Sequence, residues 1–141
     1  MPRNAVNKSI NTYSYDEVLK KSIAYFQGDE LAASTWMNKY AMKDKKNNFL
    51  ECTPDEMHWR MAKQFARKEK EYKLKSHSNA SFKYLSKYGQ ERELLDEKKI
   101  FHYFKNFKYI IPQGSVMSSL GNPNIIASLS NCIVLPEIYD S

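Results

Sequence analysis

The feature that most constrains the fold lies near the end of the chain, in residues 112–136 (PQGSVMSSLGNPNIIASLSNCIVLP). Proline, glycine and serine at its start indicate a loop, and the GNP triplet at 121–123 is a turn signal. The β-branched pair at 133–134, directly after Cys132, predicts a buried strand. A single strand leaves backbone groups unpaired and needs neighbouring strands. We therefore expect this chain to be the front part of a larger protein.

The residues before this stretch predict a series of capped helices. Ser14 begins an S-x-x-E capping box, and Gly28 is placed to end the helix that follows. Asp29 opens a second helix, so the first two helices should form a hairpin. The TPDE run at 53–56 is the strongest helix start in the chain and predicts a helix over residues 54–72.

Two further helices are predicted in the second half of the chain. One is a short helix over 81–88, ended by Gly89, and the other begins after Asp96 as its N-cap. His58 is expected to be a surface or partly buried structural residue. The apolar residues expected to face the core are Val18, Leu19, Ile23, Ala24 and Phe26 in the first helix, Leu31, Ala32, Trp36 and Tyr40 (beside Ala33 and Met37) in the second, Met57, Met61 and Phe65 in the third, and Ile100, Phe101, Phe104 and Phe107 in the last.

The charge pattern leaves one alternative function open. The net charge is +6, but lysine and glutamate alternate at 68–71, which is typical of a solvated helix face. Residues 73–90 combine lysines with Phe82, Tyr84 and Tyr88, and aromatic side chains among basic residues can stack on single-stranded nucleic acid. A basic helical module that binds single-stranded nucleic acid is therefore one alternative. An elaborated surface loop is the simpler explanation of the same segment.

Composition and cysteine content indicate a cytoplasmic protein. No run approaches the roughly 20 apolar residues that span a membrane, and the first residues lack the apolar core of a secretory signal. The two cysteines, Cys52 and Cys132, are not expected to form a disulfide in a reducing compartment. Neither they nor the three histidines have the spacing of metal ligands, so no metal site is predicted within the chain. Cys52 is expected to be a small apolar core residue.

Several stretches of the chain resemble one family. PQGSVMSSLGN followed by SLSNCIVLPEIYDS is similar to the N-terminal part of the catalytic (large) subunit of ribonucleotide reductase. The upstream stretches SYDEVLKKSIAYFQGDELAASTWMNKYAMKD and ECTPDEMHWRMAKQFARKEKEY resemble the helical lead-in of bacterial and phage members. The loop, the cysteine and the preceding helices agree in order, and FKYIIPQGSVMSSLGNPNIIASLSNC is the most specific portion.

The resemblance implies a fold that is mainly α. Residues 1–111 would be the helical N-terminal region, and residues 112–141 would be an incomplete domain. That second part would hold the substrate-phosphate loop and the first strand of a ten-stranded α/β barrel. The family's ATP-binding cone pattern, V-x-K-R-D-G, does not occur in the chain.

The resemblance also implies the roles of individual residues. Cys132 would be one of a pair of redox-active thiols that reduce the ribose 2′ position by thiyl-radical chemistry. Ser115 would help to hold the substrate diphosphate, and Asn131 and Cys132 would also contact the substrate. A hydroxyl and loop N–H groups suit phosphate oxygens, and Gly114 would let the backbone approach. A redox-active thiol must be accessible to the substrate and to its reductant, and a cysteine at the end of a strand beneath a loop would be accessible.

The implied enzyme is a ribonucleoside-diphosphate reductase that makes deoxyribonucleotides for DNA synthesis, and this chain would not be active alone. No cofactor is implied within the chain. The implied partners are the ribonucleotide substrate, the remainder of the large subunit, thioredoxin or glutaredoxin, and a metal-containing small subunit as the radical source rather than adenosylcobalamin. A truncated remnant without a catalytic role is the second alternative.

Overall fold

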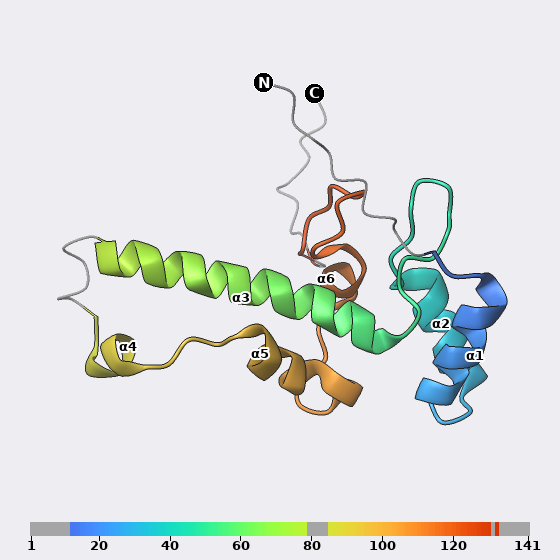
Figure 1. The fold of residues 1–141 in the computed structure, drawn as a ribbon, viewed down its shortest axis with the longest axis horizontal. Coiled ribbons are helices and arrows are strands. Elements are labelled where there is room, and N and C mark those ends of the chain that lie inside the picture. Colours follow the sequence, from blue (N-terminus) through green and yellow to red (C-terminus); the bar gives the residue numbers. More distant parts are fainter. Residues whose placement is uncertain (1–11, 79–84, 131, 133–141) are drawn as a thin grey trace, which may run out of the picture. The chain divides into compact units, whose positions relative to one another are not determined.

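The structure, a computed structural model, describes residues 12–78, 85–130 and 132 (Figure 1). Over these residues it holds six α-helices, one short 3-10 helix and isolated β-bridges, so the prediction of a mainly helical chain is confirmed. The predicted strand at 133–134 and the site residue Asn131 lie outside the described residues. None of the described helices is both long and apolar enough to cross a membrane. The chain divides into two compact units, Met1–Pro54 and Asp55–Ser141, whereas the boundary predicted after residue 111 stays a prediction.

The N-terminal unit is built on a helical hairpin, α1 (Tyr15–Tyr25) and α2 (Glu30–Lys39), which pack against each other (Figure 1). The Ser14 hydroxyl accepts a hydrogen bond from the Glu17 amide at 3.3 Å, as its capping box predicts. The Asp29 carboxylate caps α2 by accepting from the Ala32 amide at 2.8 Å. Gly28 lies in the turn between the helices with φ +97°, a conformation that suits glycine.

The core of this unit differs from the predicted apolar face in α2. Leu31 is 78% exposed, whereas Ala33, Trp36 and Met37 are buried. The core face of α2 therefore keeps Trp36 of the predicted face, and its other buried residues, Ala33 and Met37, are those that the prediction placed on the adjoining stripe. Val18, Ser22, Phe49 and Cys52 are also buried, and the prediction of Cys52 as a small core residue is confirmed.

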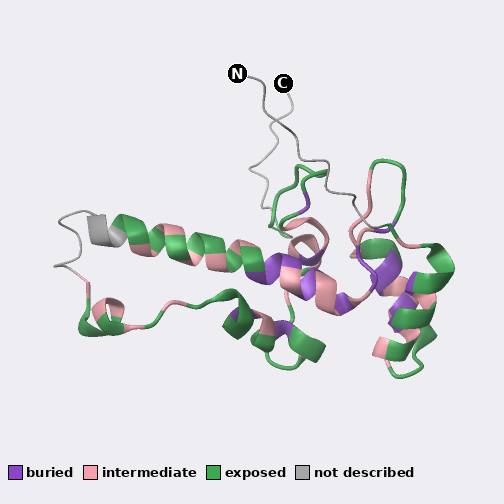
Figure 2. Ribbon diagram, viewed as in Figure 1, coloured by how far each residue is buried: buried purple, intermediate pink, exposed green. Residues whose placement is uncertain are grey.

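The C-terminal unit is organised along α3 (Pro54–Ser78). The other elements of this unit are α4 (Lys87–Glu91), α5 (Glu97–Phe104), the 3-10 helix η2 (Lys105–Phe107) and α6 (Gly114–Ser119). Figure 2 shows that buried residues gather in the first half of α3, while its second half is largely exposed. The core consists of Met57, His58, Met61, Ala62, Ile100, Phe104 and Met117. Trp59 and Phe101 stack beside this core with ring centroids 4.2 Å apart.

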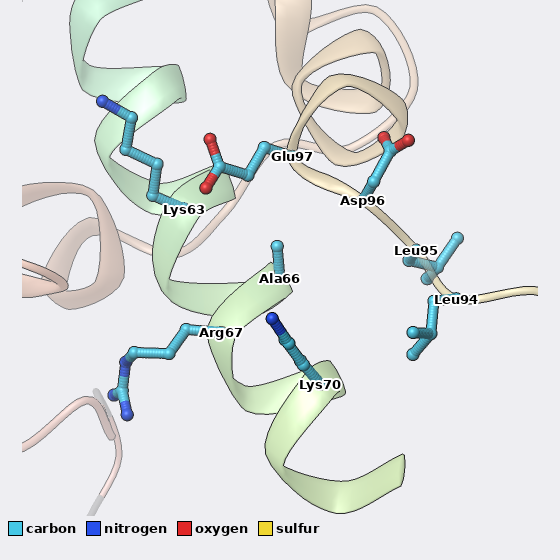
Figure 3. A pocket seen from close by; sticks show the side chains of 8 residues that line it. All are labelled: Lys63, Ala66, Arg67, Lys70, Leu94, Leu95, Asp96 and Glu97. Atoms are coloured by element: carbon cyan, nitrogen blue, oxygen red, sulfur yellow. The ribbon is translucent and has the colours of Figure 1, made fainter. Parts of the chain in front are cut away.

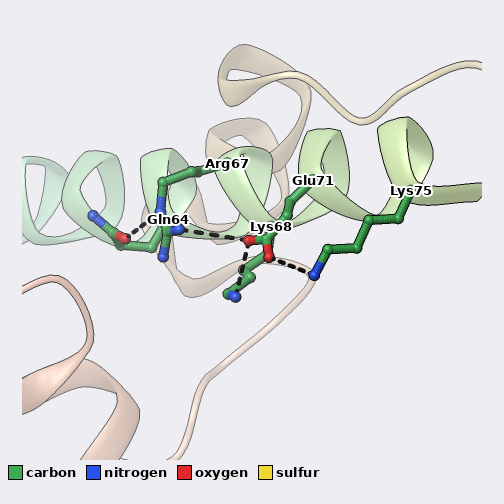
Figure 4. A network of polar contacts seen from close by, with 5 residues as sticks. All are labelled: Gln64, Arg67, Lys68, Glu71 and Lys75. Atoms are coloured by element: carbon green, nitrogen blue, oxygen red, sulfur yellow. Dashed lines mark hydrogen bonds and ion pairs between the residues drawn. The ribbon is translucent and has the colours of Figure 1, made fainter. Parts of the chain in front are cut away.

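Helix α3 begins at Pro54 as predicted but continues six residues past the predicted end at residue 72. Its exposed half carries a network of charge pairs around Glu71 (Figure 4). The Glu71 carboxylate accepts hydrogen bonds from Lys68 and Lys75, each at 3.0 Å, and lies 3.7 Å from the Arg67 guanidinium. The two lysine hydrogen bonds lower the pKa of Glu71 to about 2. Such pairs at spacings of three and four residues stabilise an exposed helix.

Two other segments differ from their predicted structure. Helix α4 covers Lys87–Glu91, so Gly89 lies inside it and does not end it. The start of the helix predicted over 81–88 falls outside the described residues. Residues 114–119, predicted as loop because of their glycine and serines, form helix α6.

The predicted N-cap of α5 is confirmed, because the Asp96 carboxylate accepts a hydrogen bond from the Lys99 amide at 2.8 Å.

Candidate functional site

Helix α6 carries Ser115 of the predicted site, and a buried arginine of α3 anchors this helix. The Arg60 side chain is only 8% exposed. Its guanidinium donates hydrogen bonds to the Leu120 carbonyl at 2.5 Å and to the Met117 carbonyl at 2.8 Å. The last carbonyls of a helix have no partner within the helix, and a cation at this end interacts favourably with the helix dipole. Arg60 therefore holds the C-terminal end of α6 against α3.

The turn after α6 is fitted closely to α3 at the same place. Gly121 has φ +78°, and a Cβ atom added there would lie 2.9 Å from Gln64 Cγ and 3.0 Å from Arg60 Cγ. Asn122 is buried, and its side-chain oxygen accepts a hydrogen bond from the Asn124 amide at 2.9 Å. The turn predicted at 121–123 is therefore confirmed, and only glycine fits its first position.

Replacing Gly121 with alanine should destabilise the chain by about 3 kcal/mol. The left-handed conformation costs an alanine about 1–2 kcal/mol, and overpacking against α3 costs a further amount on the order of 1–3 kcal/mol. Gly28→Ala is the matched control, because Gly28 also has positive φ but has open space around its Cβ position. Urea unfolding should show a clearly smaller loss for Gly28→Ala. Equal losses for the two variants would contradict the close fit at Gly121.

Ser115 lies in the first turn of α6 and ties the helix to the segment that leads to Cys132. Its hydroxyl donates a hydrogen bond to the Leu129 carbonyl at 3.1 Å. In that segment the Ser130 hydroxyl donates to the Cys132 carbonyl at 3.0 Å. A phosphate oxygen could accept the Ser115 hydrogen bond only in place of the Leu129 carbonyl. The structure thus brings Ser115 to the backbone three residues before Cys132.

Cys132 is a free, exposed thiol, whereas Cys52 is buried. Exposure is a requirement for a thiol that exchanges with an external reductant, since attack on a disulfide needs access to the sulfur. Of the predicted site residues, Ser115 and Cys132 are described and lie in segments joined by a hydrogen bond. In the part of the chain that the structure describes, no group of three or more His, Cys, Asp or Glu side chains is placed to hold a metal ion.

His58 is buried completely, which corrects the prediction of a surface or partly buried residue. Its ring packs edge-on against Phe107, with centroids 4.6 Å apart, and faces Phe104 at 6.1 Å. Neither ring nitrogen has a hydrogen-bond partner, and Nδ1 lies 3.8 Å from the Asp55 carboxylate. Burial lowers the pKa of His58 to about 4, against the opposing effect of Asp55. His58 is therefore a neutral part of the core.

Two hollows of the C-terminal unit lack the features of a catalytic site. The first, of about 380 Å³, places Lys63, Arg67 and Lys70 of α3 across from Asp96 and Glu97 (Figure 3). Charges of both signs line it, and the Asp96 carboxylate already caps α5. The second, of about 500 Å³, is lined mainly by apolar and aromatic side chains of α3, α5 and residues 110–116.

The basic segment considered for nucleic-acid binding is partly neutralised by its own chain. Of its lysines, Lys75 pairs with Glu71 and Lys73 donates a hydrogen bond to the Arg92 carbonyl. The Arg92 guanidinium itself pairs with Glu69. Two of the aromatic residues of this segment, Phe82 and Tyr84, lie outside the described residues. These pairings favour the interpretation of a solvated, self-compensated helix face.

Arg60 is the residue of this site that the sequence analysis missed. Only the lysines that alternate with glutamates were expected on a solvated face, and the one hint for Arg60 was its place near the apolar face containing Met57 and Met61. On a helix Arg60 lies beside Met57 and one turn before Gln64, at the edge of that face. Its partners, the carbonyls of residues 117 and 120, are 57 and 60 positions away in the sequence. No local pattern could have identified them.

One comparison with known proteins agrees with this arrangement of helices. A family model described as "Ribonucleotide reductase, all-alpha domain" matches residues 26–124, which is more than half of the chain. The matched range contains Arg60, Ser115 and the turn at Gly121, and it ends before Cys132. No curated protein and no solved structure matches the chain.

Proposed function

Because the chain belongs to the ribonucleotide reductase large-subunit family through its N-terminal all-alpha domain, we propose that it is the N-terminal part of a ribonucleoside-diphosphate reductase catalytic subunit. The observation that carries the proposal is the family match over residues 26–124. The exposed thiol of Cys132, close behind the matched range and next to the segment held by Ser115, supports it.

In the proposed reaction Cys132 is one of two thiols that reduce the ribose. The two thiols give up two electrons and two protons as they close into a disulfide, the 2′-hydroxyl leaves as water, and C2′ gains a hydrogen. Thioredoxin or glutaredoxin then reopens the disulfide by thiol exchange. The second thiol and the radical-bearing cysteine would come from the remainder of the large subunit, since Cys52 is buried.

Ser115 and Asn131 have binding roles in this proposal. The Ser115 hydroxyl would donate to a phosphate oxygen of the substrate in place of the Leu129 carbonyl, and Asn131 would contact the substrate beside Cys132. The radical would be supplied by a metal-containing small subunit rather than by adenosylcobalamin. We place the assembled enzyme in the cytoplasm, where thioredoxin-type reductants are available.

Complementation tests the proposed function. The chain should be combined with the remainder of its catalytic subunit, the radical-generating subunit and thioredoxin, and deoxyribonucleotide formation from a ribonucleoside diphosphate should be measured. We expect turnover from the complete mixture and none when this chain is left out. A mixture that turns over equally well without the chain would contradict the proposal and favour a remnant.

A further inference from the structure

We infer that Arg60 is a positioning residue for the substrate-phosphate site, which it controls by holding α6, the helix that carries Ser115. This inference rests on the proposed function and adds a residue to it. The physical basis is the pair of hydrogen bonds from the Arg60 guanidinium to the carbonyls of Met117 and Leu120.

The chemistry of Arg60 suits this task better than it suits packing alone. A guanidinium presents several N–H groups in one rigid plane, so it can donate to two carbonyls at once. Burying a charge is costly unless it is hydrogen-bonded, and an apolar side chain of similar volume fills a core at lower cost. Arg60 is nearly as buried as the apolar residues Met57 and Met61 on the same helix. Its charge is directed at the end of α6, where helix carbonyls need donors.

Helix α6 depends on such an anchor because it is short. It has six residues, and isolated helices shorter than roughly 12 residues are marginal in water. Within α6, only Met117 is buried in the core. The position of α6 is therefore set largely by Met117 and by the Arg60 hydrogen bonds at its C-terminal end.

The contacts continue from α6 to the proposed catalytic segment. Ser115, one turn before the end that Arg60 holds, donates to the Leu129 carbonyl, three residues before Cys132. The turn after α6 also passes close to Arg60, because a Cβ atom added at Gly121 would lie 3.0 Å from Arg60 Cγ. A shift of α6 would move the Ser115 hydroxyl relative to the substrate, while the thiol chemistry of Cys132 would be affected less.

The test compares Arg60→Lys and Arg60→Gln with Arg67→Gln in the complemented enzyme. Arg67 lies on the same helix, and its side chain is 60% exposed. We expect both Arg60 variants to raise the KM for the ribonucleoside diphosphate, by up to about tenfold for the loss of one phosphate hydrogen bond, and to change kcat less. Arg67→Gln should leave both constants unchanged.

A double-mutant cycle distinguishes positioning from general destabilisation. If Arg60 acts through Ser115, then Arg60→Gln should add no further increase in KM in a Ser115→Ala background. An undiminished increase in that background would overturn the inference. An Arg60 variant with unchanged KM would overturn it as well.

Hydrogen exchange on the chain alone gives a second measurement that does not require activity. Arg60→Lys should speed exchange of the amides of Val116, Met117 and Leu120, which donate hydrogen bonds to the carbonyls of Gln113 and Val116. The amide of Ile100 in α5 is the control, and its exchange should not change. Unchanged exchange in α6 would overturn the inference and leave the proposed function standing. A Ser115→Ala enzyme with a wild-type KM would instead overturn the proposed phosphate role of Ser115, and the inference with it.

Discussion

Replacing Cys132 with serine should abolish multiple turnover of the complemented enzyme while the substrate still binds. A serine hydroxyl keeps the size and the hydrogen-bonding capacity of the side chain but can neither form a disulfide nor supply an electron at the ribose. The expected result is complete loss of deoxyribonucleotide formation with thioredoxin present. Substrate binding, measured by equilibrium dialysis with a labelled ribonucleoside diphosphate, should persist, because Ser115 and Asn131 are unchanged.

Cys52→Ala is the matched control for this prediction. Cys52 is 2% exposed in the N-terminal unit and, like Cys132, is not in a disulfide. Its replacement should leave turnover intact and reduce stability by about 1 kcal/mol, the cost of removing one small buried group. If the Cys132→Ser enzyme reduced substrate at the wild-type rate with thioredoxin, the assignment of Cys132 as a redox thiol would be wrong.

A single-turnover experiment sharpens the distinction between a redox role and a binding role. Without an external reductant, the pre-reduced wild-type thiol pair should supply the two electrons for one deoxyribonucleotide per site. The pair then stays oxidised as a disulfide, and turnover stops. The Cys132→Ser enzyme should yield none. A residue that only bound the ribose would instead slow product formation without removing the yield of the first turnover.

The helix starts could be predicted because their causes are local. Ser14, Asp29 and Asp96 each accept a hydrogen bond from an amide three residues later, and the pattern that produces this bond is visible in the sequence. The end of α3 was predicted too early because the apolar period stops near Phe65. Charge pairs around Glu71 continue the helix where apolar packing ends.

The site was predictable only in part, because its parts depend on long-range contacts. Resemblance to a family pointed to Ser115 and Cys132, but the glycine and serines at 114–119 predicted a loop where α6 forms. That helix is held by Arg60 and by the burial of Met117, and neither contact leaves a local pattern. The burial of His58 was missed for the same reason, since Phe104 and Phe107, which enclose it, come from another part of the chain.

Lowering the pH from 6.5 to 4 should reduce the free energy of unfolding through His58 by about 3 kcal/mol. The folded protein holds the pKa of His58 at about 4, because burial opposes the charged ring, whereas an unfolded histidine titrates near 6.5. Between these values the unfolded chain binds a proton that the folded chain does not. Stability therefore falls as the pH drops through this window, and the loss through His58 levels off below pH 4.

The variant His58→Leu tests this prediction because leucine has a similar volume and no ring nitrogens to leave unpaired in the core. At neutral pH its stability should lie within about 1.5 kcal/mol of wild type, as for other volume-conserving core replacements. Carboxylates such as Glu71 also lose their native pairing in acid, so the wild-type curve alone does not isolate His58. The difference between the two curves, from urea unfolding at each pH, cancels those shared contributions. That difference should change by about 3 kcal/mol between pH 6.5 and 4. If the two curves of unfolding free energy against pH ran parallel instead, His58 would accept a proton in the folded state as easily as in the unfolded state.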